Sequence, residues 1–508
     1  MVRASLAFSI ALLCSPVLAR PPDSAGGDQV VTIPVTSSGK QLRWVLRMLN
    51  EEEKDQSGEQ VAEHFTDSFL EQVSVEAVTK ELADIRSSVY DNKKVRAVSV
   101  DQGERDDTMT AVLAAKGVHR YLSVFIIVDD KSNKIAGLRF EPAGGGAAGG
   151  ETPNPTRGGS WDEMDKAIEE MEGDVSFGCY ELVPRDAGNP GGEFVLMDIA
   201  AKNENRALAI GSTFKLYVLG AIAEDVAAGK GAWTDLVEIR DDMKSLPSGT
   251  MQLLPEGTKK PVADFAMQMI SISDNTAADH LIRHAGRERV EAYTNAMNDN
   301  TARNTPFLTT REAFAIKLAA ASREQDQYAE ADDVAQRAML APGGVLADLR
   351  PDLEQASDWG EPRMIESVEW FASSRQVCHA FARLHQLEQN PKNEPLGLIM
   401  RKNPGLALDR SIWKSVAFKG GSEPGVLNMS WLLQRDDGRW YVFSVGKNDH
   451  KKDVDQEEFN RLCYRGLAIL ADDGCKAQTP APAPPAHPKK DPFMDTGDEP
   501  APTVDDGT

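Results

Sequence analysis

The sequence predicts two α+β domains in tandem, each built around an antiparallel sheet. Two low-complexity stretches delimit them: a Gly-rich linker at residues 143–160 and a Pro-rich, acidic tail at 476–508. Between residues 40 and 142, helical periodicity gives way to short β-rich runs. Between residues 161 and 472, strand-like runs occur near both ends and helical runs in the middle. Helices segregated against an antiparallel sheet define the α+β class.

Composition restricts the partners of the chain. Its 508 residues are 41% hydrophobic, which suffices for more than one packed core. The formal net charge is −23 and the pI is about 4.9. Because phosphate recognition needs clustered Lys and Arg, we expect no nucleic-acid or membrane-surface partner. We expect a monomer that acts on a small molecule or a peptide without a cofactor.

The amino terminus has the pattern of a secretory signal. Arg3 precedes an apolar run at residues 6–13, and small residues lead up to Ala19, so we expect residues 1–19 to be removed by cleavage after Ala19. No other stretch approaches the length of a membrane span. The sequence therefore predicts an exported bacterial protein, periplasmic or secreted.

Four cysteines remain after removal of the signal, an even number in a compartment that permits disulfides. Three pairings are open to them, and so is the alternative of buried, unbridged thiols. They are Cys179, Cys378, Cys463 and Cys475.

The two domains differ in the order of their elements. In the first, apolar residues at three- and four-residue spacing are followed by KVRAVSV, MTAVLAAK, YLSVFIIVDD and KIAGLRF, which predicts helices and then a meander. In the second, two strand-like runs precede many helical runs, three further strands and a final helix. That order predicts one antiparallel sheet with strands from both ends of the segment.

The motif Ser-x-x-Lys occurs at Ser37, Ser212 and Ser411, and only Ser212 opens a long apolar helical pattern. Residues three apart share a helix face, so Lys215 can reach the Ser212 hydroxyl. A serine nucleophile needs a base, and a lysine serves when burial lowers its pKa. The alternative is that Ser212 only caps the helix.

A second motif, Ser273-Asp274-Asn275, lies between two helical runs. Ser273 is a candidate to relay a proton to a leaving group, and the Asn275 amide a candidate to hold a substrate carbonyl. We expect Asp274 to brace the loop. The alternative is an ordinary helix-capping tripeptide.

The third motif, Lys419-Gly420-Gly421-Ser422, ends a strand-like run. Lys419 would place a cation beside the site, and the glycines let the backbone approach a ligand closely. Backbone N–H groups here could form an oxyanion hole with the Ser212 N–H. Otherwise, Lys419 is an edge-strand charge.

The order of these three motifs resembles the class A β-lactamase and penicillin-binding protein superfamily, over residues 161–472. The stretches SDNTAADHL and FLTTREAFA strengthen the resemblance. It implies a β-lactamase-like fold, an oxyanion hole from the Ser212 and Ser422 N–H groups, and substrate contacts at Gly421. The remaining implied roles are the acylated serine for Ser212, the base for Lys215, the proton relay for Ser273, a substrate-carbonyl contact for Asn275 and the anion-binding cation for Lys419.

Two departures from class A enzymes affect the expected chemistry. Residues 297–310 contain no glutamate where class A enzymes carry the one that activates the deacylating water. Gly420 replaces the hydroxyl residue of Lys-Thr-Gly, although Ser422 can compensate. We therefore expect weak or absent β-lactamase activity.

A narrower resemblance covers both domains. The linker, an acidic insertion at about residues 322–376, and the phrases VEWFAS and FKGGSEPGV are similar to the Cpe/LpqF proteins and the two-domain protein of the clavulanic-acid gene cluster. In that group an NTF2-like domain precedes a β-lactamase-like one. The resemblance implies esterase or acyl-transfer chemistry, with a docking or pocket-covering role for the first domain.

Three functions stay open at this point. The leading one is a serine hydrolase that acts on an ester, an amide or a β-lactam. A penicillin-binding sensor without turnover and a D,D-peptidase acting on cell-wall peptide would use the same motifs. A metal site has little support, because His280 and His284 share a helix face without an evident third ligand.

Overall fold

The structure is a computed structural model that describes most of residues 31–472. The predicted signal, most of the Gly-rich linker and the tail lie outside the described residues. Within 31–472, the undescribed positions are 52–57, 71–72, 103–106, 117, 119–121, 130, 143–158, 187–192, 246–247, 299–301, 352–358 and 407.

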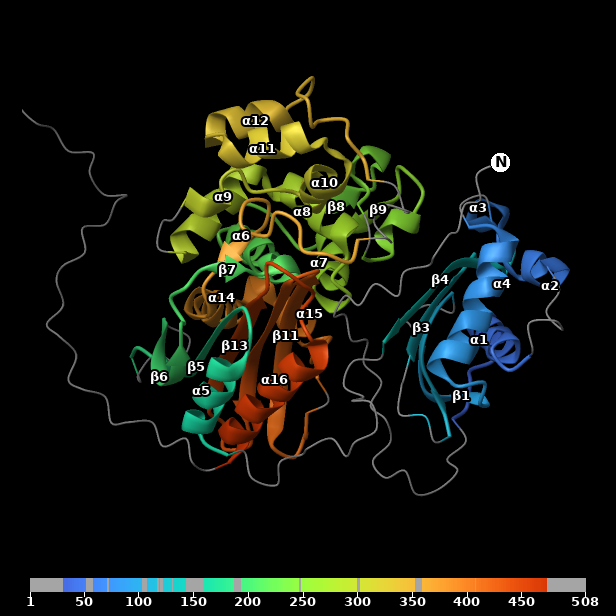
Figure 1. The fold of residues 1–508 in the computed structure, drawn as a ribbon, viewed down its shortest axis with the longest axis horizontal. Coiled ribbons are helices and arrows are strands. Elements are labelled where there is room, and N and C mark those ends of the chain that lie inside the picture. The colour runs from blue at the N-terminus through green and yellow to red at the C-terminus, as the bar shows by residue number, and fades with distance from the viewer. Residues whose placement is uncertain are drawn as a thin grey trace, which may run out of the picture.

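The amino-terminal domain consists of helices followed by a four-stranded antiparallel meander, in the order β1-β2-β3-β4 (Figure 1). The helices pack on one face of the sheet around their own core, in which Trp44, Phe65 and Tyr90 are buried. Strands follow the helices as predicted. The elements are α1 (Ser37–Met48), α2 (Gly58–His64), α3 (Asp67–Leu70), α4 (Val75–Asp84), the π-helical turn η2 (Ile85–Val89), β1 (Val95–Gln102), β2 (Thr108–Ala115), β3 (Leu122–Val128) and β4 (Ile135–Pro142).

The second domain is built on a five-stranded antiparallel sheet in the order β11-β12-β13-β5-β6. Its strands come from both ends of the segment, as the sequence predicts. They are β5 (Asp174–Pro184), β6 (Phe194–Lys202), β11 (Trp413–Glu423), β12 (Val426–Arg435) and β13 (Trp440–Asn448). Strand β11, which carries the Lys-Gly-Gly-Ser motif, lies at one edge of the sheet.

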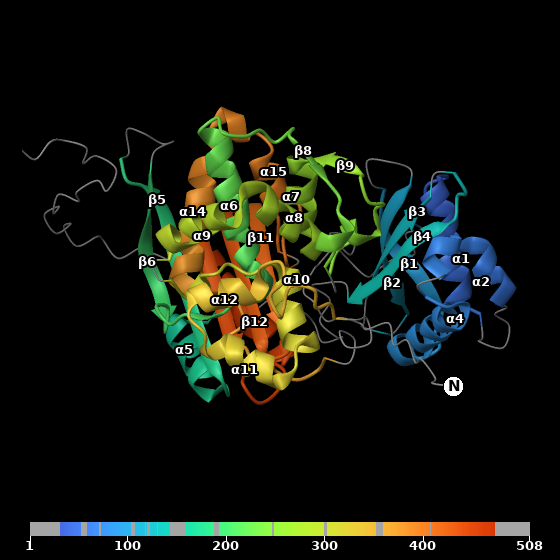
Figure 2. The ribbon, with the colours of Figure 1, turned by 90° about the horizontal axis from the view of Figure 1, so that it is seen from above.

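Helices cover both faces of this sheet. One face packs against the terminal helices α5 (Trp161–Glu170) and α16 (Gln456–Ala471) around a core that includes Trp431 and Phe443. The other face packs against the helical middle of the domain (Figure 2). The helices of that middle are α6 (Lys215–Ala227), α7 (Val262–Ser271), α8 (Asn275–Ala285), α9 (Arg287–Met297), α10 (Thr310–Phe314), α14 (Ser374–Leu387) and α15 (Leu396–Arg401).

Short elements complete the domain. Strand β7 (Leu208–Ala209) pairs with β10 (Phe371–Ala372), and β8 (Leu236–Glu238) pairs with β9 (Lys259–Pro261). The acidic insertion forms α11 (Ser322–Glu330) and α12 (Asp333–Leu340), which lie at the same end of the domain as α10 (Figure 1). The two domains meet where Gly137 of β4 approaches Leu253, since a Cβ on Gly137 would lie 2.8 Å from a Leu253 methyl carbon.

Three cysteines of the second domain, Cys179, Cys378 and Cys463, are buried, and no disulfide joins them to one another. Pairings among these three are therefore excluded, and any pairing with Cys475 lies outside the described residues. No helix in the described part of the chain is long and apolar enough to cross a bilayer.

Candidate active site

Ser212 lies in a short 3-10 turn, η3 (Gly211–Phe214), between β7 and α6. The prediction that Ser212 itself opens the α-helix is wrong by one turn, because α6 begins at Lys215. The capping alternative is also wrong, since Phe214 is the N-cap and no side-chain cap bond is present. The Ser212 side chain is therefore available for chemistry.

Lys215 is fully buried beside Ser212. Its Nζ lies 3.2 Å from Ser212 Oγ, 3.1 Å from Ser273 Oγ, 2.7 Å from Asn275 Oδ1 and 2.5 Å from the Ser273 carbonyl oxygen. Burial lowers the pKa of Lys215 to about 7, although Asp274 and Asp279 oppose that shift. Within the described part of the chain, no carboxylate pairs with this amine.

These contacts suit a neutral amine. A neutral lysine has two N–H donors and one lone pair, whereas an ammonium has three donors and no acceptor. The Ser273 carbonyl and Asn275 Oδ1 can take the two donors, which leaves the lone pair for the Ser212 hydroxyl proton. This arrangement is what a general base for Ser212 requires.

The three residues of the Ser273-Asp274-Asn275 loop make different contacts. Ser273 has a positive φ of 58°, and its Oγ lies between Lys215 Nζ and Lys419 Nζ, 3.0 Å from the latter. Asp274 is the N-cap of α8 and accepts from the Ala277 N–H at 2.8 Å. The capping alternative thus applies to Asp274, while Ser273 and Asn275 face Lys215.

Residues 248–251, which belong to none of the three motifs, are hydrogen-bonded to the Ser273-Asp274-Asn275 loop. The Ser248 hydroxyl donates to the Ser273 carbonyl at 2.7 Å, and the Thr250 and Met251 N–H groups donate to Asp274. A Cβ on Gly249 would lie 2.2 Å from Asp274 Cγ, so the two segments are in close contact. Sequence reasoning missed this segment, because it forms no spacing pattern with a residue more than twenty positions away.

Lys419 is buried at the edge strand and does not point into solvent as a simple edge charge would. Its Nζ donates to Ser273 Oγ and to the Gly420 carbonyl at 2.5 Å. Residues of an edge strand alternate between facing the neighbouring strand and facing the open edge. Gly420 carries an edge-facing carbonyl, so the backbone N–H of Ser422, two residues on, faces the same edge.

The turn η3, which carries Ser212 and is called the nucleophile turn below, is in backbone contact with β11. A Cβ on Gly421 would lie 2.0 Å from the Ile210 carbonyl oxygen and 2.6 Å from Ser212 N. A Cβ on Gly211, whose φ is 48°, would lie 2.9 Å from Ser422 N. Glycine is required at both positions, and the approach brings the Ser212 and Ser422 N–H groups to one place.

The other two Ser-x-x-Lys copies have different surroundings. Lys414 is exposed and donates to the Ser411 carbonyl at 2.8 Å, not to its hydroxyl. The Ser37 hydroxyl donates to Asn133 Oδ1, and Lys40 is exposed. In neither pair is the lysine amine buried beside the serine hydroxyl, as Lys215 is beside Ser212.

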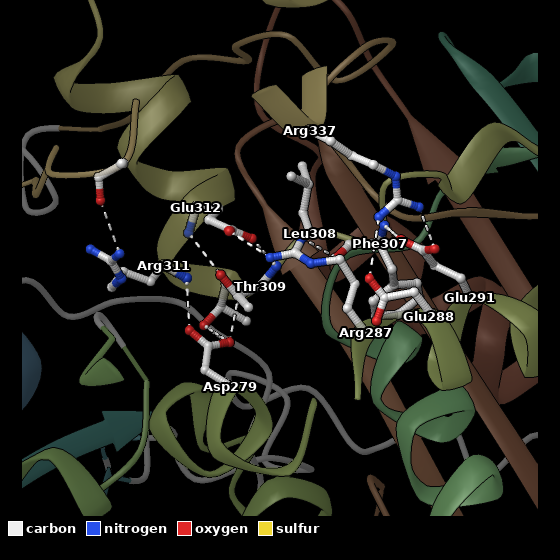
Figure 3. Close-up of polar contacts among 12 residues, drawn as sticks. Asp279, Arg287, Glu288, Glu291, Phe307, Leu308, Thr309, Arg311, Glu312 and Arg337 are labelled. Carbon is white, nitrogen blue, oxygen red and sulfur yellow. Dashed lines mark hydrogen bonds and ion pairs between the residues drawn. The ribbon is translucent and has the colours of Figure 1, made fainter. Parts of the chain in front are cut away.

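Two buried carboxylates, Asp279 and Glu291, accept hydrogen bonds from backbone N–H groups (Figure 3). Asp279 accepts from the Thr310 N–H at 2.7 Å and the Arg311 N–H at 2.9 Å, and burial raises its pKa to about 7. Glu291 accepts from the Phe307 N–H at 2.8 Å. Each of these acids accepts from the segment in which the sequence lacks a glutamate.

Arginines complete the same network (Figure 3). Arg287 donates to the Phe307 carbonyl at 2.7 Å and to Glu312 at 2.6 Å, while Arg337 of the insertion donates to Glu291 at 2.5 Å. These contacts give the carboxylates of the network a structural role.

His280 is not arranged as a metal ligand. Its Nε2 accepts from the Arg240 N–H at 3.0 Å, and its Nδ1 lies 2.7 Å from the Thr276 carbonyl. His284 is exposed. Within the described residues, no group of three potential ligands is placed to hold a metal.

The β-lactamase-like arrangement of the sheet and the Ser-Lys-Ser geometry define a protein with the fold of the penicillin-interacting serine hydrolases. A model of the beta-lactamase enzyme family matches residues 197–463, more than half of the chain. The chain belongs to the beta-lactamase enzyme family. A second model, described as the ORF 12 gene product N-terminal family, matches residues 33–132.

Solved structures give distant matches over 61% of this chain. A β-lactamase from Sphaerobacter thermophilus is 19% identical over 96% of its length, with a TM-score of 0.38. A class A β-lactamase from Mycobacterium abscessus is 14% identical over 98% of its length, with a TM-score of 0.39. These likenesses are too weak to transfer an activity. A comparison with curated proteins finds no match.

Proposed function

We propose that the protein is an exported serine acyl-hydrolase that forms an acyl-enzyme on Ser212 from an ester or amide substrate, β-lactams included. The observation that carries the proposal is the Lys215 amine, which is buried, has no carboxylate partner among the residues that the structure describes, and lies 3.2 Å from Ser212 Oγ. A pKa lowered to about 7 lets this amine accept a proton near neutral pH.

Acylation follows from these positions. Lys215 Nζ takes the Ser212 hydroxyl proton as Oγ attacks the substrate carbonyl, and the oxyanion is held by the Ser212 and Ser422 N–H groups. As the tetrahedral intermediate collapses, the C–O or C–N bond breaks. The proton passes from Lys215 through Ser273 Oγ to the leaving oxygen or nitrogen. Lys419, 3.0 Å from Ser273 Oγ, provides positive charge for an anionic substrate group.

The glutamate that activates the deacylating water in class A enzymes has no counterpart here. The stretch 297–310 has no glutamate, and the nearby Asp279, Glu291 and Glu312 are engaged with the backbone or with arginines. Lys215 is then the base that remains for a hydrolytic water. We expect an acyl-enzyme that is hydrolysed slowly, with β-lactam turnover weak or absent.

The fold of the first domain is consistent with the resemblance to the two-domain Cpe/LpqF proteins. We propose that it is NTF2-like, as in the Cpe/LpqF proteins, and that it docks beside the catalytic domain to cover the pocket. Its helix-then-meander order and the approach of Gly137 to Leu253 support this proposal. Leu253 closely follows the segment that holds the Ser273 loop.

A fluorescent penicillin, a chromogenic cephalosporin and p-nitrophenyl acetate test the proposed function. We expect the wild type to be labelled and to turn over the ester faster than the cephalosporin, while Ser212→Ala does neither. Ser411→Ala, in the exposed copy of the motif, is the matched control and should behave as the wild type.

The outcomes separate the three candidate functions. Stable labelling without turnover of either compound would favour a sensor, and release of D-alanine from a cell-wall peptide would favour a D,D-peptidase. Labelling or ester hydrolysis that persists in Ser212→Ala would overturn the acyl-enzyme assignment.

A further inference from the structure

Three ionisable side chains meet in the interior near the end of β11. Lys317 lies in the π-helical turn η7 (Ala315–Ala319), Glu369 precedes β10, and Glu423 ends β11. Lys317 Nζ donates to Glu369 Oε1 at 2.9 Å and also to Glu423 Oε1. All three side chains are at least 95% buried. The acylation proposed above does not use them.

The charges of this cluster do not balance when all three groups are ionised. Two carboxylates and one ammonium leave one negative charge in the interior, which is costly. Two carboxylates at one site resolve this by sharing a proton. Glu369 and Glu423 both accept from Lys317 Nζ, and burial together with the charge of Glu369 raises the pKa of Glu423 well above its usual range. Although burial opposes its charge, the two carboxylates raise the pKa of Lys317.

The cluster is attached to both sides of the nucleophile turn. Side chains alternate along a strand, so Glu423 faces the same side as Gly421, which contacts Ser212 N and the Ile210 carbonyl. Glu369 is followed by Trp370, whose carbonyl accepts from the Ile210 N–H at 2.9 Å. The Trp370 ring stacks on Phe214 with centroids 3.9 Å apart.

We propose that Glu423, held by Lys317 and Glu369, is a positioning residue for acylation, because it fixes the end of β11 that presents the Ser422 N–H to the oxyanion. The inference rests on the proposed function. A single shared proton keeps the cluster neutral. Loss of that proton would place a negative charge two residues beyond Gly421 and oppose the oxyanion.

A cavity allows the shared proton to exchange. It has a volume of about 360 Å³, and its lining includes Glu369, Arg303 and Asp333. Asp333 is exposed, so the cavity gives Glu369 a route to solvent. Among the described residues, Asp449 and Asp453 also bring charge close to Glu423, because both bond to Gly425 in the turn after β11.

The test measures the second-order rate of acylation by a fluorescent penicillin from pH 5 to 10, in the full chain. Glu423→Ala should lose at least tenfold in this rate at pH 7. Glu423→Gln, which has the shape of the protonated acid, should restore it. The wild-type rate should fall at alkaline pH, and this fall should be absent in Glu423→Gln. Glu388→Gln is the control, because Glu388 is a partly buried acid that pairs with His385 and Arg401 and not with the cluster.

Thermal unfolding reports on the cluster without any substrate. A folded pKa above the unfolded value means that the folded state binds more protons between the two pKa values, so stability falls as pH rises through that range. The wild-type Tm should therefore fall relative to that of Glu423→Gln as pH rises above about 4.5, the unfolded pKa range of glutamate.

The outcomes are distinct. A wild type that is not labelled would overturn the proposed function, and the positioning role with it. A labelled wild type with an unchanged rate in Glu423→Ala, or the same alkaline fall in Glu423→Gln, would overturn only the positioning role.

Discussion

Lys215 and Lys317 are both fully buried in the same domain, yet their surroundings favour opposite charge states. Lys215 contacts a carbonyl, an amide oxygen and hydroxyls, and burial lowers its pKa to about 7. Lys317 contacts two carboxylates, which raise its pKa despite burial. The comparison shows that burial alone does not set the charge of a lysine. A neutral amine suits catalysis, whereas a paired ammonium suits structure.

The largest expected effect comes from removing the unpaired lysine. Lys215→Ala should lower the rate of acylation by about 10²–10⁴, the usual contribution of a general base. Labelling by a fluorescent penicillin, followed over time, measures this rate. Lys414→Ala is the matched control, since Lys414 is exposed and lies three residues after Ser411. Acylation at the native rate in Lys215→Ala would show that another group is the base.

Removing the paired lysine should act on stability. Lys317→Met leaves one uncompensated negative charge on the two buried acids and should lower the free energy of unfolding by about 3–5 kcal/mol. Lys215→Met removes a neutral amine and leaves only uncharged acceptors unpaired, for a loss of about 1–2 kcal/mol. Urea unfolding at pH 8, above the pKa of about 7 for Lys215, measures both. Equal losses in the two variants would contradict the assigned difference in charge.

A smaller effect is expected where β11 meets the nucleophile turn. Gly421→Ala places a Cβ against backbone atoms of Ile210 and Ser212, which should cost about 1–3 kcal/mol of stability and slow acylation. Gly360→Ala is the control, since a Cβ there has no atom within 4 Å. Thermal unfolding and labelling should both show the difference, and unchanged labelling in Gly421→Ala would argue against a tight oxyanion hole.

The sequence predicts the surroundings of Lys215 better than it predicts those of Lys317. Ser212 and Lys215 lie three residues apart, and Ser273 and Lys419 each belong to a motif with its own local pattern. Their meeting depends on tertiary structure, but ordered motifs on expected elements are enough to predict it. The five-stranded sheet follows from the alternation of strand-like and helical runs at both ends of the domain.

The buried cluster could not be predicted in the same way. Lys317, Glu369 and Glu423 lie in three elements and share no spacing, and each is an ordinary charged residue in the sequence. The segment at Ser248 that holds the Ser273 loop likewise shares no sequence spacing with the residues that it contacts. Such contacts depend on how loops return across the fold, which periodicity and capping signals do not record.

The pH dependence of acylation tests the central claim, that Lys215 is a neutral base beside Ser212. The second-order rate of labelling by a fluorescent penicillin should rise about tenfold per pH unit below pH 7, because only the unprotonated amine accepts the serine proton. It should level off just above the pKa of about 7, before the fall at alkaline pH that Glu423 is expected to cause. A rate that stays constant from pH 5 to pH 8 would contradict the claim.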